Sequence, residues 1–281
     1  MIQRTFLATL EFQEILKDMG KSIPVITTLH GTDITLVGKD PSCKPVINYS
    51  INKSDGVTAV SNSLKNETVS IFNISNEIDV IPNFIDINKY QKVKRNPYRG
   101  KLCSKGERLI IHTSNFRKVK RIQDVINIFC KINKEIPSKL IMIGDGPERA
   151  NIESLTRSLC SLKDVMFIGK IPDVENVLHN ADLFLLTSEK ESFGLSALEA
   201  MASSVPVISS NAGGLPELVQ DGVSGYTCDI GDVNTMSEKA IEILDKKNIN
   251  LFKNNALRTA SKYDISIILP KYIEFYKKIL N

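Results

Sequence analysis

Residues 108–144 read RLIIHTSNFRKVKRIQDVINIFCKINKEIPSKLIMIG, and this stretch decides the fold class. Two short apolar runs, RLIIHTS at 108–114 and KLIMIG at 139–144, flank a helical pattern at 121–136. Near-continuous apolar strands that are joined by a helix are typical of parallel sheets with both faces covered. The stretch therefore predicts a strand–helix–strand unit of an α/β protein.

The same alternation extends over most of the chain. We expect helices at 148–160 and 235–247, between further apolar runs. The other expected strands are PVITTL (24–29), GVTAV (56–60), DVIPNF (79–84), VMFIG (165–169), DLFLLT (182–187), PVISS (206–210) and GYTC (225–228). This order predicts an α/β, doubly wound fold built on parallel sheets.

The two halves of this pattern are unequal. About six expected strands fall within 108–230, whereas about three fall within 1–84. A complete doubly wound domain rarely has so few strands, so we expect the N-terminal domain to be incomplete. The first segment, TFLATLEFQEILKDMG at 5–20, already resembles a helix that leads into a strand. The chain is thus expected to begin in the middle of a domain.

Length and composition exclude several classes of protein. The chain has 281 residues, of which 42% are hydrophobic, enough for two domains with a sizeable core. No apolar run reaches the roughly 18 residues of a membrane helix, so no transmembrane segment is expected. A net charge of +4 is too mild to indicate nucleic-acid binding. The basic stretch at 89–108 is either a solvated linker or a surface that attracts anions or anionic lipid.

The cysteines and histidines suggest neither disulfides nor a metal site. The five cysteines, at 43, 103, 130, 160 and 228, are odd in number and form no CxxC pair. We therefore expect reduced, partly buried thiols in a cytoplasmic protein, and no zinc. The three histidines, at 30, 112 and 179, lie in unrelated contexts, and no DxD string is present.

The stretch ESFGLSALEA at 191–200 places Glu191 just before a helical pattern and Glu199 two turns into it. Ser192 can cap this helix, whose free backbone N–H groups would then bind a phosphate. The residues of that first turn are Phe193, Gly194 and Leu195. A buried carboxylate needs hydrogen-bond donors. For Glu199 these are either the ribose hydroxyls of a ligand or an Arg or Lys on a neighbouring element.

Two loops that follow expected strands add further candidates. SNFRKVKR at 114–121 lies at the carboxyl end of its strand, where open α/β sheets bind ligands. Arg117 and Lys120 could there clamp a diphosphate, although basic loops are common. In TTLHGTD at 27–33, His30 precedes a glycine that allows a tight turn. His30 is either a ligand contact or a histidine satisfied by the backbone.

These features together resemble glycosyltransferase family four. The resemblance rests on ESFGLSALEA, GDGPE (144–148), GGLPELV (213–219) and VIPNFID (80–86), and it covers about residues 20–245. It implies the GT-B fold, with two doubly wound, Rossmann-like domains. Residues 1–86 would form part of the acceptor-side domain, and residues 87–262 the domain that binds the nucleotide sugar. Residues 263–281 would form a helix that crosses back to the N-terminal domain.

The resemblance also implies roles for the candidate residues at the donor. Glu199 would hold the ribose hydroxyls of UDP, and Glu191 the hydroxyls of the donor sugar. Lys120 would neutralise the diphosphate leaving group, without a metal and with retention of the anomeric configuration. The phosphate would lie at the segment Ser192, Phe193, Gly194 and Leu195.

Other donor contacts follow from the same resemblance. Most of the family has an arginine where this chain has Asn115, so Arg117 is the expected substitute. Backbone groups from Gly169 to Ile171 would hold the uracil. His30 would face the donor sugar near the bond that breaks.

Three strings resemble those of family members that transfer N-acetylglucosamine from UDP to L-malate, the first step of bacillithiol biosynthesis. They are TTLHGTDITLVGKDPS, INKSDGVTAVSNSL and SNFRKVKRI. Thr27, Thr28 and Asn48 are then the candidates for the malate site. We expect no cofactor, a cytoplasmic protein, and impaired transfer by a truncated chain; a homo-oligomer is left open. The alternatives are a membrane-surface transferase for a lipid or polysaccharide, and a UDP-sugar-binding remnant without turnover.

Overall fold

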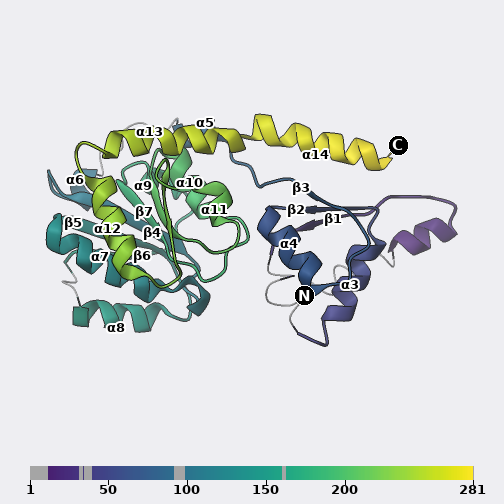
Figure 1. Ribbon diagram of the computed structural model, residues 1–281, viewed down its shortest axis with the longest axis horizontal. Coiled ribbons are helices and arrows are strands. Elements are labelled where there is room, and N and C mark those ends of the chain that lie inside the picture. The colour runs from purple at the N-terminus through teal and green to yellow at the C-terminus, as the bar shows by residue number, and fades with distance from the viewer. Residues whose placement is uncertain (1–11, 32–33, 35–39, 92–98, 160–162, 281) are drawn as a thin grey trace. The chain divides into compact units, whose positions relative to one another are not determined.

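A computed structural model describes residues 12–31, 34, 40–91, 99–159 and 163–280 of the protein. The chain divides into two compact units. Unit 1 comprises Met1–Phe84 together with Ser266–Asn281, and unit 2 comprises Ile85–Ile265. Figure 1 labels the elements of both units, which are described separately below.

Unit 2 is built on a six-stranded sheet in the order β6-β5-β4-β7-β8-β9. All of its strand pairs are parallel. The strands are β4 (Arg108–Ser114), β5 (Ser138–Gly144), β6 (Val165–Gly169), β7 (Leu183–Leu186), β8 (Val207–Ser210) and β9 (Gly225–Cys228). The chain moves outward from β4 in one direction and from β7 in the other. The boundary between β4 and β7 is therefore the switch point, at which sheets of this kind bind ligands.

Helices cover both faces of this sheet (Figure 1). They are α5 (Ile87–Gln91), α6 (Arg99–Leu102), α7 (Ile122–Glu135), α8 (Arg149–Leu159), α9 (Glu175–Leu178), α10 (Leu195–Ala202), α11 (Leu215–Leu218), α12 (Val233–Leu244) and α13 (Ile249–Ala260). Two 3₁₀ turns, η2 (Lys118–Lys120) and η3 (Ser261–Tyr263), complete the unit. This architecture confirms the predicted α/β, doubly wound class.

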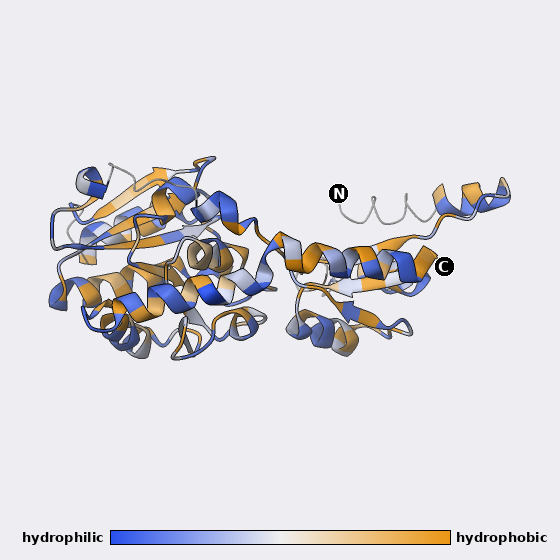
Figure 2. Ribbon diagram, turned by 90° about the horizontal axis from the view of Figure 1, so that it is seen from above, coloured by the Kyte–Doolittle hydropathy of each residue, from blue (hydrophilic) through white to orange (hydrophobic). Residues whose placement is uncertain are grey.

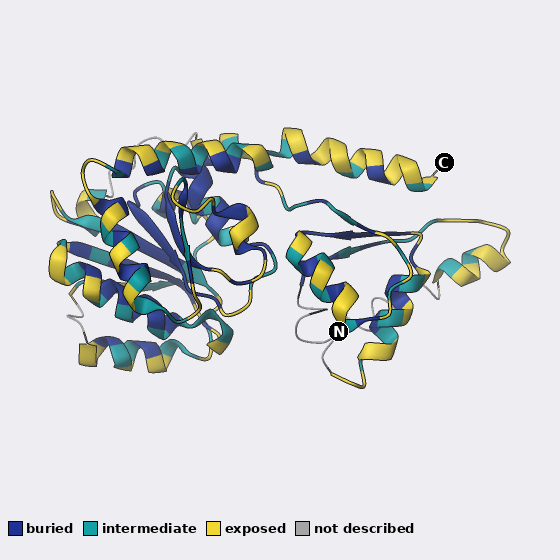
Figure 3. Cartoon of the chain, in the orientation of Figure 1, coloured by how far each residue is buried: buried dark blue, intermediate teal, exposed yellow. Residues whose placement is uncertain are grey.

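The core of unit 2 follows from the spacing of apolar residues. On α7, Ile122, Val125, Ile126 and Phe129 recur every three or four residues, and all are buried. They pack with strand residues such as Leu140 in one hydrophobic cluster. Figure 3 shows the central strands of this sheet largely in dark blue, with yellow on the outer faces of the helices. Strands that are covered on both faces have no polar side to present, which explains their continuous apolar runs.

Unit 1 has a three-stranded parallel sheet in the order β1-β2-β3. Its strands are β1 (Ile26–Leu29), β2 (Gly56–Ala59) and β3 (Ile78–Val80), and its helices include α3 (Lys44–Lys53), α4 (Asn62–Ile71) and a helix at 12–18. Ser61 caps α4, because its side chain accepts a hydrogen bond from the Leu64 amide at 3.1 Å. The strand expected at 79–84 is shorter than predicted. Its ladder ends before Pro82, which has no N–H to donate.

The C-terminal helix α14 (Ile265–Leu280) packs within unit 1 from Ser266 onward. Ile268 and Phe275 are buried in a cluster with Ile81. Gly56 lets the helix approach, because a Cβ there would lie 2.8 Å from the Phe275 ring. Figure 2 shows hydrophobic and hydrophilic residues alternating around this helix, as expected of an amphipathic segment.

One expectation about the cysteines is wrong. Cys130, on α7, is disulfide-bonded, whereas Cys43, Cys103 and Cys228 are free thiols. Cys160 lies outside the described residues. Within the described part of the chain, every helix is too short or too polar to span a bilayer.

Candidate active site at the switch point of unit 2

The loops that leave β4 and β7 carry most of the predicted donor-site residues. Strand β4 ends at Ser114 and is followed by the segment 115–121, which contains Lys120. Strand β7 ends at Leu186 and is followed by the segment 187–194, which contains Glu191. Because β4 and β7 are neighbouring parallel strands, both loops leave the same edge of the sheet.

Lys120 and Glu191 form an ion pair in this crevice. The Lys120 Nζ lies 2.6 Å from the Glu191 Oε2, and the Ser188 hydroxyl donates to the same oxygen at 3.3 Å. The two side chains are 18% and 15% exposed, so the pair is shielded but still open to a ligand. The structure thus brings together Lys120, which was expected at the diphosphate, and Glu191, which was expected at the donor sugar.

Hydrogen bonds to backbone groups join the two loops. The Thr187 hydroxyl lies within hydrogen-bond distance of the carbonyls of both Lys120 (3.1 Å) and Arg121 (3.0 Å). The Glu189 amide donates to the Val119 carbonyl at 2.8 Å. The buried Thr187 therefore couples the position of the lysine to the strand that precedes the glutamate.

Two glycines after β8 contact the backbone of the Glu191 loop and hold it in place. The Gly214 amide donates to the Glu191 carbonyl at 2.9 Å. A Cβ on Gly213 would lie 1.9 Å from that carbonyl oxygen, and a Cβ on Gly214 would lie 2.3 Å from the Ser192 oxygen. The sequence showed these glycines only as part of a family string. Their close approach to another loop is a tertiary contact that no local pattern reveals.

Helix α10 begins later than expected, and Ser192 is not its cap. The N-cap residue is Gly194, with a φ of 98°, and the helix starts at Leu195. Its first intrahelical bond runs from the Leu198 amide to the Gly194 carbonyl at 3.0 Å. Glycine adopts this left-handed conformation without strain, so the chain turns at Gly194 rather than at the serine. The buried Phe193 precedes the turn and packs edge-on against Tyr263.

Glu199 projects from α10 toward α5 and α9. Its carboxylate interacts electrostatically with Tyr90, Glu175 and Lys89. Burial raises the pKa of Glu199, and the charge of Glu175 acts in the same direction, whereas Tyr90 and Lys89 oppose the shift. The side chains that act on Glu199 are thus a tyrosine, a lysine and a second glutamate.

His112 is a residue of this region that the sequence did not single out for function. It is fully buried on β4, with Nδ1 2.9 Å from the Leu185 carbonyl and Nε2 2.8 Å from the Ser114 hydroxyl. Burial lowers its pKa to about 4. A neutral ring donates from Nδ1 to the carbonyl and accepts from the serine at Nε2. His112 therefore fixes Ser114, the last residue before the basic loop.

The remaining donor candidates lie on neighbouring loops of unit 2. Asn115 and Arg117 are exposed and follow β4 directly. Gly169, with a φ of 74°, ends β6, and the half-buried Ile171 follows it. Gly144 lets the loop after β5 contact β4, because a Cβ there would lie 1.8 Å from the Ser114 carbonyl oxygen.

The candidates Thr27, Thr28, His30 and Asn48 belong to unit 1. Thr27 shares a 2.7 Å hydrogen bond with the Ser54 hydroxyl, and the Thr58 hydroxyl donates to Thr28 at 3.0 Å. The exposed His30 follows β1 directly. Asn48 lies on α3 and accepts from the Asn52 side chain at 3.4 Å.

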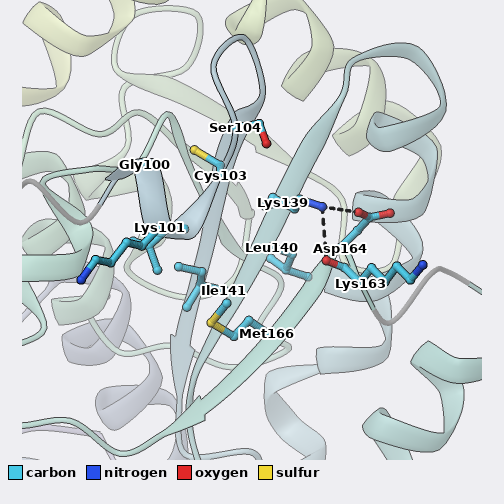
Figure 4. Close-up of a pocket in the computed structure, with 11 residues that line it drawn as sticks. Gly100, Lys101, Cys103, Ser104, Lys139, Leu140, Ile141, Lys163, Asp164 and Met166 are labelled. Atoms are coloured by element: carbon cyan, nitrogen blue, oxygen red, sulfur yellow. Dashed lines mark hydrogen bonds and ion pairs between the residues drawn. The ribbon is translucent and has the colours of Figure 1, made fainter.

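A separate cavity of about 240 Å³ lies beside α6 and the first residues of β5 and β6 (Figure 4). Its Lys139 is held by Asp164 at 2.6 Å. The cavity is at the amino ends of the strands, and its lining includes none of the predicted site residues. It is therefore not the donor site that the sequence predicts.

Comparison with known proteins identifies the family. Residues 95–261 match the family described as "Glycosyl transferases group 1". The chain belongs to this family of glycosyl transferases. Residues 6–89 match "Glycosyltransferase Family 4", so the resemblance to family four that the sequence suggested is confirmed.

Individual relatives agree with this assignment. The chain is 45% identical over 266 residues to the N-acetyl-alpha-D-glucosaminyl L-malate synthase of Bacillus anthracis, covering 94% of this chain and 70% of that protein. Its fold superimposes on HepE of Anabaena in a crystal structure with UDP and glucose, with a TM-score of 0.85 and 23% identity. That superposition covers 98% of this chain and 76% of HepE.

A second solved structure shows the same fold. The sucrose-phosphate synthase of Thermosynechococcus elongatus matches with a TM-score of 0.81 and 19% identity, covering 95% of this chain and 70% of the other. These likenesses confirm the GT-B fold of the chain.

Proposed function

We propose that this glycosyltransferase moves N-acetylglucosamine from UDP to the hydroxyl of L-malate, with retention of the anomeric configuration. The observation that carries the proposal is the 45% identity to the malate synthase of Bacillus anthracis, over 94% of the chain. The proposal places the reaction at the first step of bacillithiol biosynthesis, in the cytoplasm.

In this proposal, Lys120 and the backbone amides that begin α10 bind the diphosphate of UDP. An anion that approaches Lys120 competes with Glu191 for the ammonium group. Glu191 would then turn its oxygens to the hydroxyls of the sugar. The ligand-free ion pair thus keeps both charged groups paired until the donor arrives, which avoids an uncompensated buried charge.

The rest of UDP would extend along the carboxyl edge of the sheet. The uracil would hydrogen-bond to the backbone from Gly169 to Ile171, where β6 ends. The ribose diol would donate to Glu199, since α9 lies between the end of β6 and α10 and packs on α10. Arg117 and Asn115 would border the phosphates. The diphosphate would lie against the backbone of Ser192, Phe193, Gly194 and Leu195.

The reaction is balanced by the two substrates alone. The bond between C1 of the sugar and the β-phosphate oxygen breaks, and a bond between C1 and the malate hydroxyl oxygen forms on the same face. The departing phosphate oxygen takes the hydroxyl proton. Lys120 would stabilise the negative charge that develops on that phosphate, which is the main electrostatic demand of the step. We propose that no metal is needed.

The acceptor side of the proposal rests on unit 1. Thr27, Thr28 and Asn48 carry hydroxyl and amide groups suited to hydrogen bonds with the two malate carboxylates. His30 is proposed to face the donor sugar near the reacting bond.

An assay with both substrates tests the proposal. The chain is incubated with UDP-N-acetylglucosamine and L-malate, and the products are followed by mass spectrometry, with EDTA in a parallel reaction. Equal amounts of UDP and N-acetylglucosaminyl malate are expected, and succinate, which lacks the hydroxyl, gives none. UDP release without the malate product, or transfer only to lipid or polysaccharide, would contradict the proposed acceptor. Loss of transfer in EDTA that is restored by Mg²⁺ or Mn²⁺ would contradict the metal-free step.

A further inference from the structure

Arg121 joins the 3₁₀ turn η2 to helix α7 with an uncommon backbone conformation. Its φ of 46° and ψ of 48° lie in the left-handed region, where the β-carbon of an L-residue crowds the following carbonyl oxygen. The Arg121 amide closes η2 by donating to the Lys118 carbonyl at 2.9 Å. The Arg121 carbonyl accepts from the Asp124 amide, in the first turn of α7, also at 2.9 Å. The left-handed turn therefore lies between α7 and the η2 segment that carries Lys120.

The side chain of Arg121 is fixed on two sides. Its Nε donates to the Asp124 Oδ2 at 2.6 Å, and the side chain of Asp124 is only 6% exposed. Its guanidinium lies against Gly231, where an added Cβ would be 2.8 Å from Nη2. Because hydrogen bonds between charged groups are stronger than neutral ones, this anchor opposes rotation of the Arg121 backbone out of the left-handed conformation.

The turn controls where Lys120 lies. The buried Thr187 hydroxyl is 3.1 Å from the Lys120 carbonyl and 3.0 Å from the Arg121 carbonyl. From this backbone position the Lys120 Nζ reaches the Glu191 carboxylate at 2.6 Å. Rotation about φ or ψ of Arg121 turns the preceding residues relative to α7. Such a rotation would displace Lys120 from both Thr187 and Glu191.

We propose that Arg121 is a positioning residue for Lys120, because its anchored side chain holds the left-handed turn that directs the Lys120 ammonium group toward the diphosphate. This inference rests on the proposed function, since it assumes that Lys120 binds the diphosphate of UDP. Arg121 acts through the backbone of the loop and not through its own charge.

The test measures the affinities of the full chain for UDP and for uridine by titration calorimetry, with the variants Arg121→Ala and Arg121→Gly. Both substitutions remove the guanidinium, but alanine disfavours the left-handed conformation and glycine adopts it without strain. Arg121→Ala should bind UDP roughly five- to thirtyfold more weakly, the factor that corresponds to the usual cost of a left-handed residue. Arg121→Gly should stay within about threefold of the wild type, because only the added flexibility of glycine remains. Uridine, which has no diphosphate, should bind all three proteins alike.

The matched control is Ser204→Ala. Within the part of the chain that the structure describes, Ser204 is the other non-glycine residue with a positive φ, 61°, and it lies just after α10. The control places alanine in a left-handed turn that does not carry Lys120, so it should bind UDP and uridine like the wild type.

Two results would overturn the inference. Equal weakening of UDP binding by Arg121→Ala and Arg121→Gly would show that the guanidinium matters and the backbone conformation does not. An Arg121→Ala variant that binds UDP as the wild type does, or that loses UDP and uridine equally, would show that the turn does not act on the diphosphate.

A double variant separates this inference from the proposed function. In a Lys120→Ala background, Arg121→Ala should weaken UDP binding by less than about twofold, because the turn acts through the lysine. A fully independent effect would contradict the inference while leaving the role of Lys120 intact. A wild-type chain that binds UDP no more tightly than uridine would instead contradict the proposed function itself.

Discussion

Units 1 and 2 differ in how their predicted site residues are held. In unit 2, Glu191 is fixed at its side chain by Lys120 and Ser188 and at its carbonyl by the Gly214 amide. In unit 1, Thr27 and Thr28 are held by single hydroxyl–hydroxyl bonds from other strands and loops. The predicted site residues of unit 2 are thus held by charges and backbone contacts, and Thr27 and Thr28 of unit 1 by neutral hydrogen bonds.

The difference indicates where binding energy is concentrated. Charge-assisted bonds are about twice as strong as neutral ones, and they fix a geometry for a charged ligand such as a diphosphate. We therefore expect substitutions in unit 2 to affect UDP strongly and substitutions in unit 1 to leave UDP binding almost unchanged. Three of the following four predictions test that contrast, and the one on His112 concerns stability.

The largest effect is expected for Lys120→Ala. Loss of a charge that stabilises the leaving group should lower kcat/KM by about 10²- to 10³-fold, or about 3–4 kcal/mol. The same variant should bind UDP more weakly and bind uridine almost normally, as measured by calorimetry. Lys118→Ala, in the same 3₁₀ turn and exposed, is the matched control and should retain activity. Equal losses for UDP and uridine would mean that Lys120 is structural.

A large effect on stability is expected from His112. Its pKa of about 4 lies below the ordinary value of 6.5, so between these pH values the unfolded chain binds a proton that the folded chain does not. The free energy of unfolding should therefore rise with pH across this window, by up to about 3 kcal/mol from this group. Urea unfolding at a series of pH values, compared with His112→Phe, measures the contribution. If the free energies of unfolding of the two proteins changed with pH in the same manner, His112 would not make this contribution.

Glu199→Gln should affect binding and stability in opposite directions. Replacing a charged acceptor by a neutral one at two ribose bonds should weaken UDP binding by about 2 kcal/mol, or roughly 30-fold. Burial raises the pKa of Glu199, so its ionised form destabilises the ligand-free fold. The variant should consequently unfold at a higher temperature at neutral pH. That gain should shrink as the pH falls through the raised pKa, where Glu199 becomes protonated.

The same variant could give a result that contradicts this account. A variant that lost stability at neutral pH, or bound UDP as tightly as the wild type, would show that Glu199 is a structural residue. Thermal unfolding and calorimetry on one preparation distinguish these outcomes.

The smallest effect on UDP is expected from Phe275→Leu in unit 1. The substitution removes part of a buried ring from the cluster with Ile81 and Ile268, at a cost of about 1 kcal/mol. Amide hydrogen exchange at β2 and β3 should become faster, whereas UDP affinity should stay the same. A weakening of UDP binding as large as that of Glu199→Gln would abolish the contrast between the units.

Much of the fold of unit 2 was predictable because its strands are apolar and most of them are buried. RLIIHTS and VMFIG match the observed β4 and β6 residue for residue. Turn chemistry caused the errors. The start of α10 was misplaced because Gly194 adopts a positive φ, and β3 was drawn too long across Pro82. The disulfide of Cys130 has no sequence signal, since it depends on tertiary proximity.

The candidate site was predictable only in part. Lys120 was placed by the expected strand that its loop follows, whereas Glu191 was placed by the helix after it and by the family resemblance. The contact between Gln91 and the Ala202 carbonyl joins α5 to α10, which are distant in the chain, and nothing in either segment indicates it. The hydrogen bonds of His112 were not predicted for a similar reason, because its partners Leu185 and Ser114 come from two strands.

A crystal structure of the chain with UDP tests the central claim most directly. The account predicts that the diphosphate lies within ion-pair distance of Lys120, near the start of α10, with both ribose hydroxyls on the Glu199 carboxylate. Glu191 should then have lost its 2.6 Å contact with Lys120 to the phosphate. UDP bound elsewhere, for example in the cavity beside α6, or a ribose that makes no contact with Glu199, would contradict it.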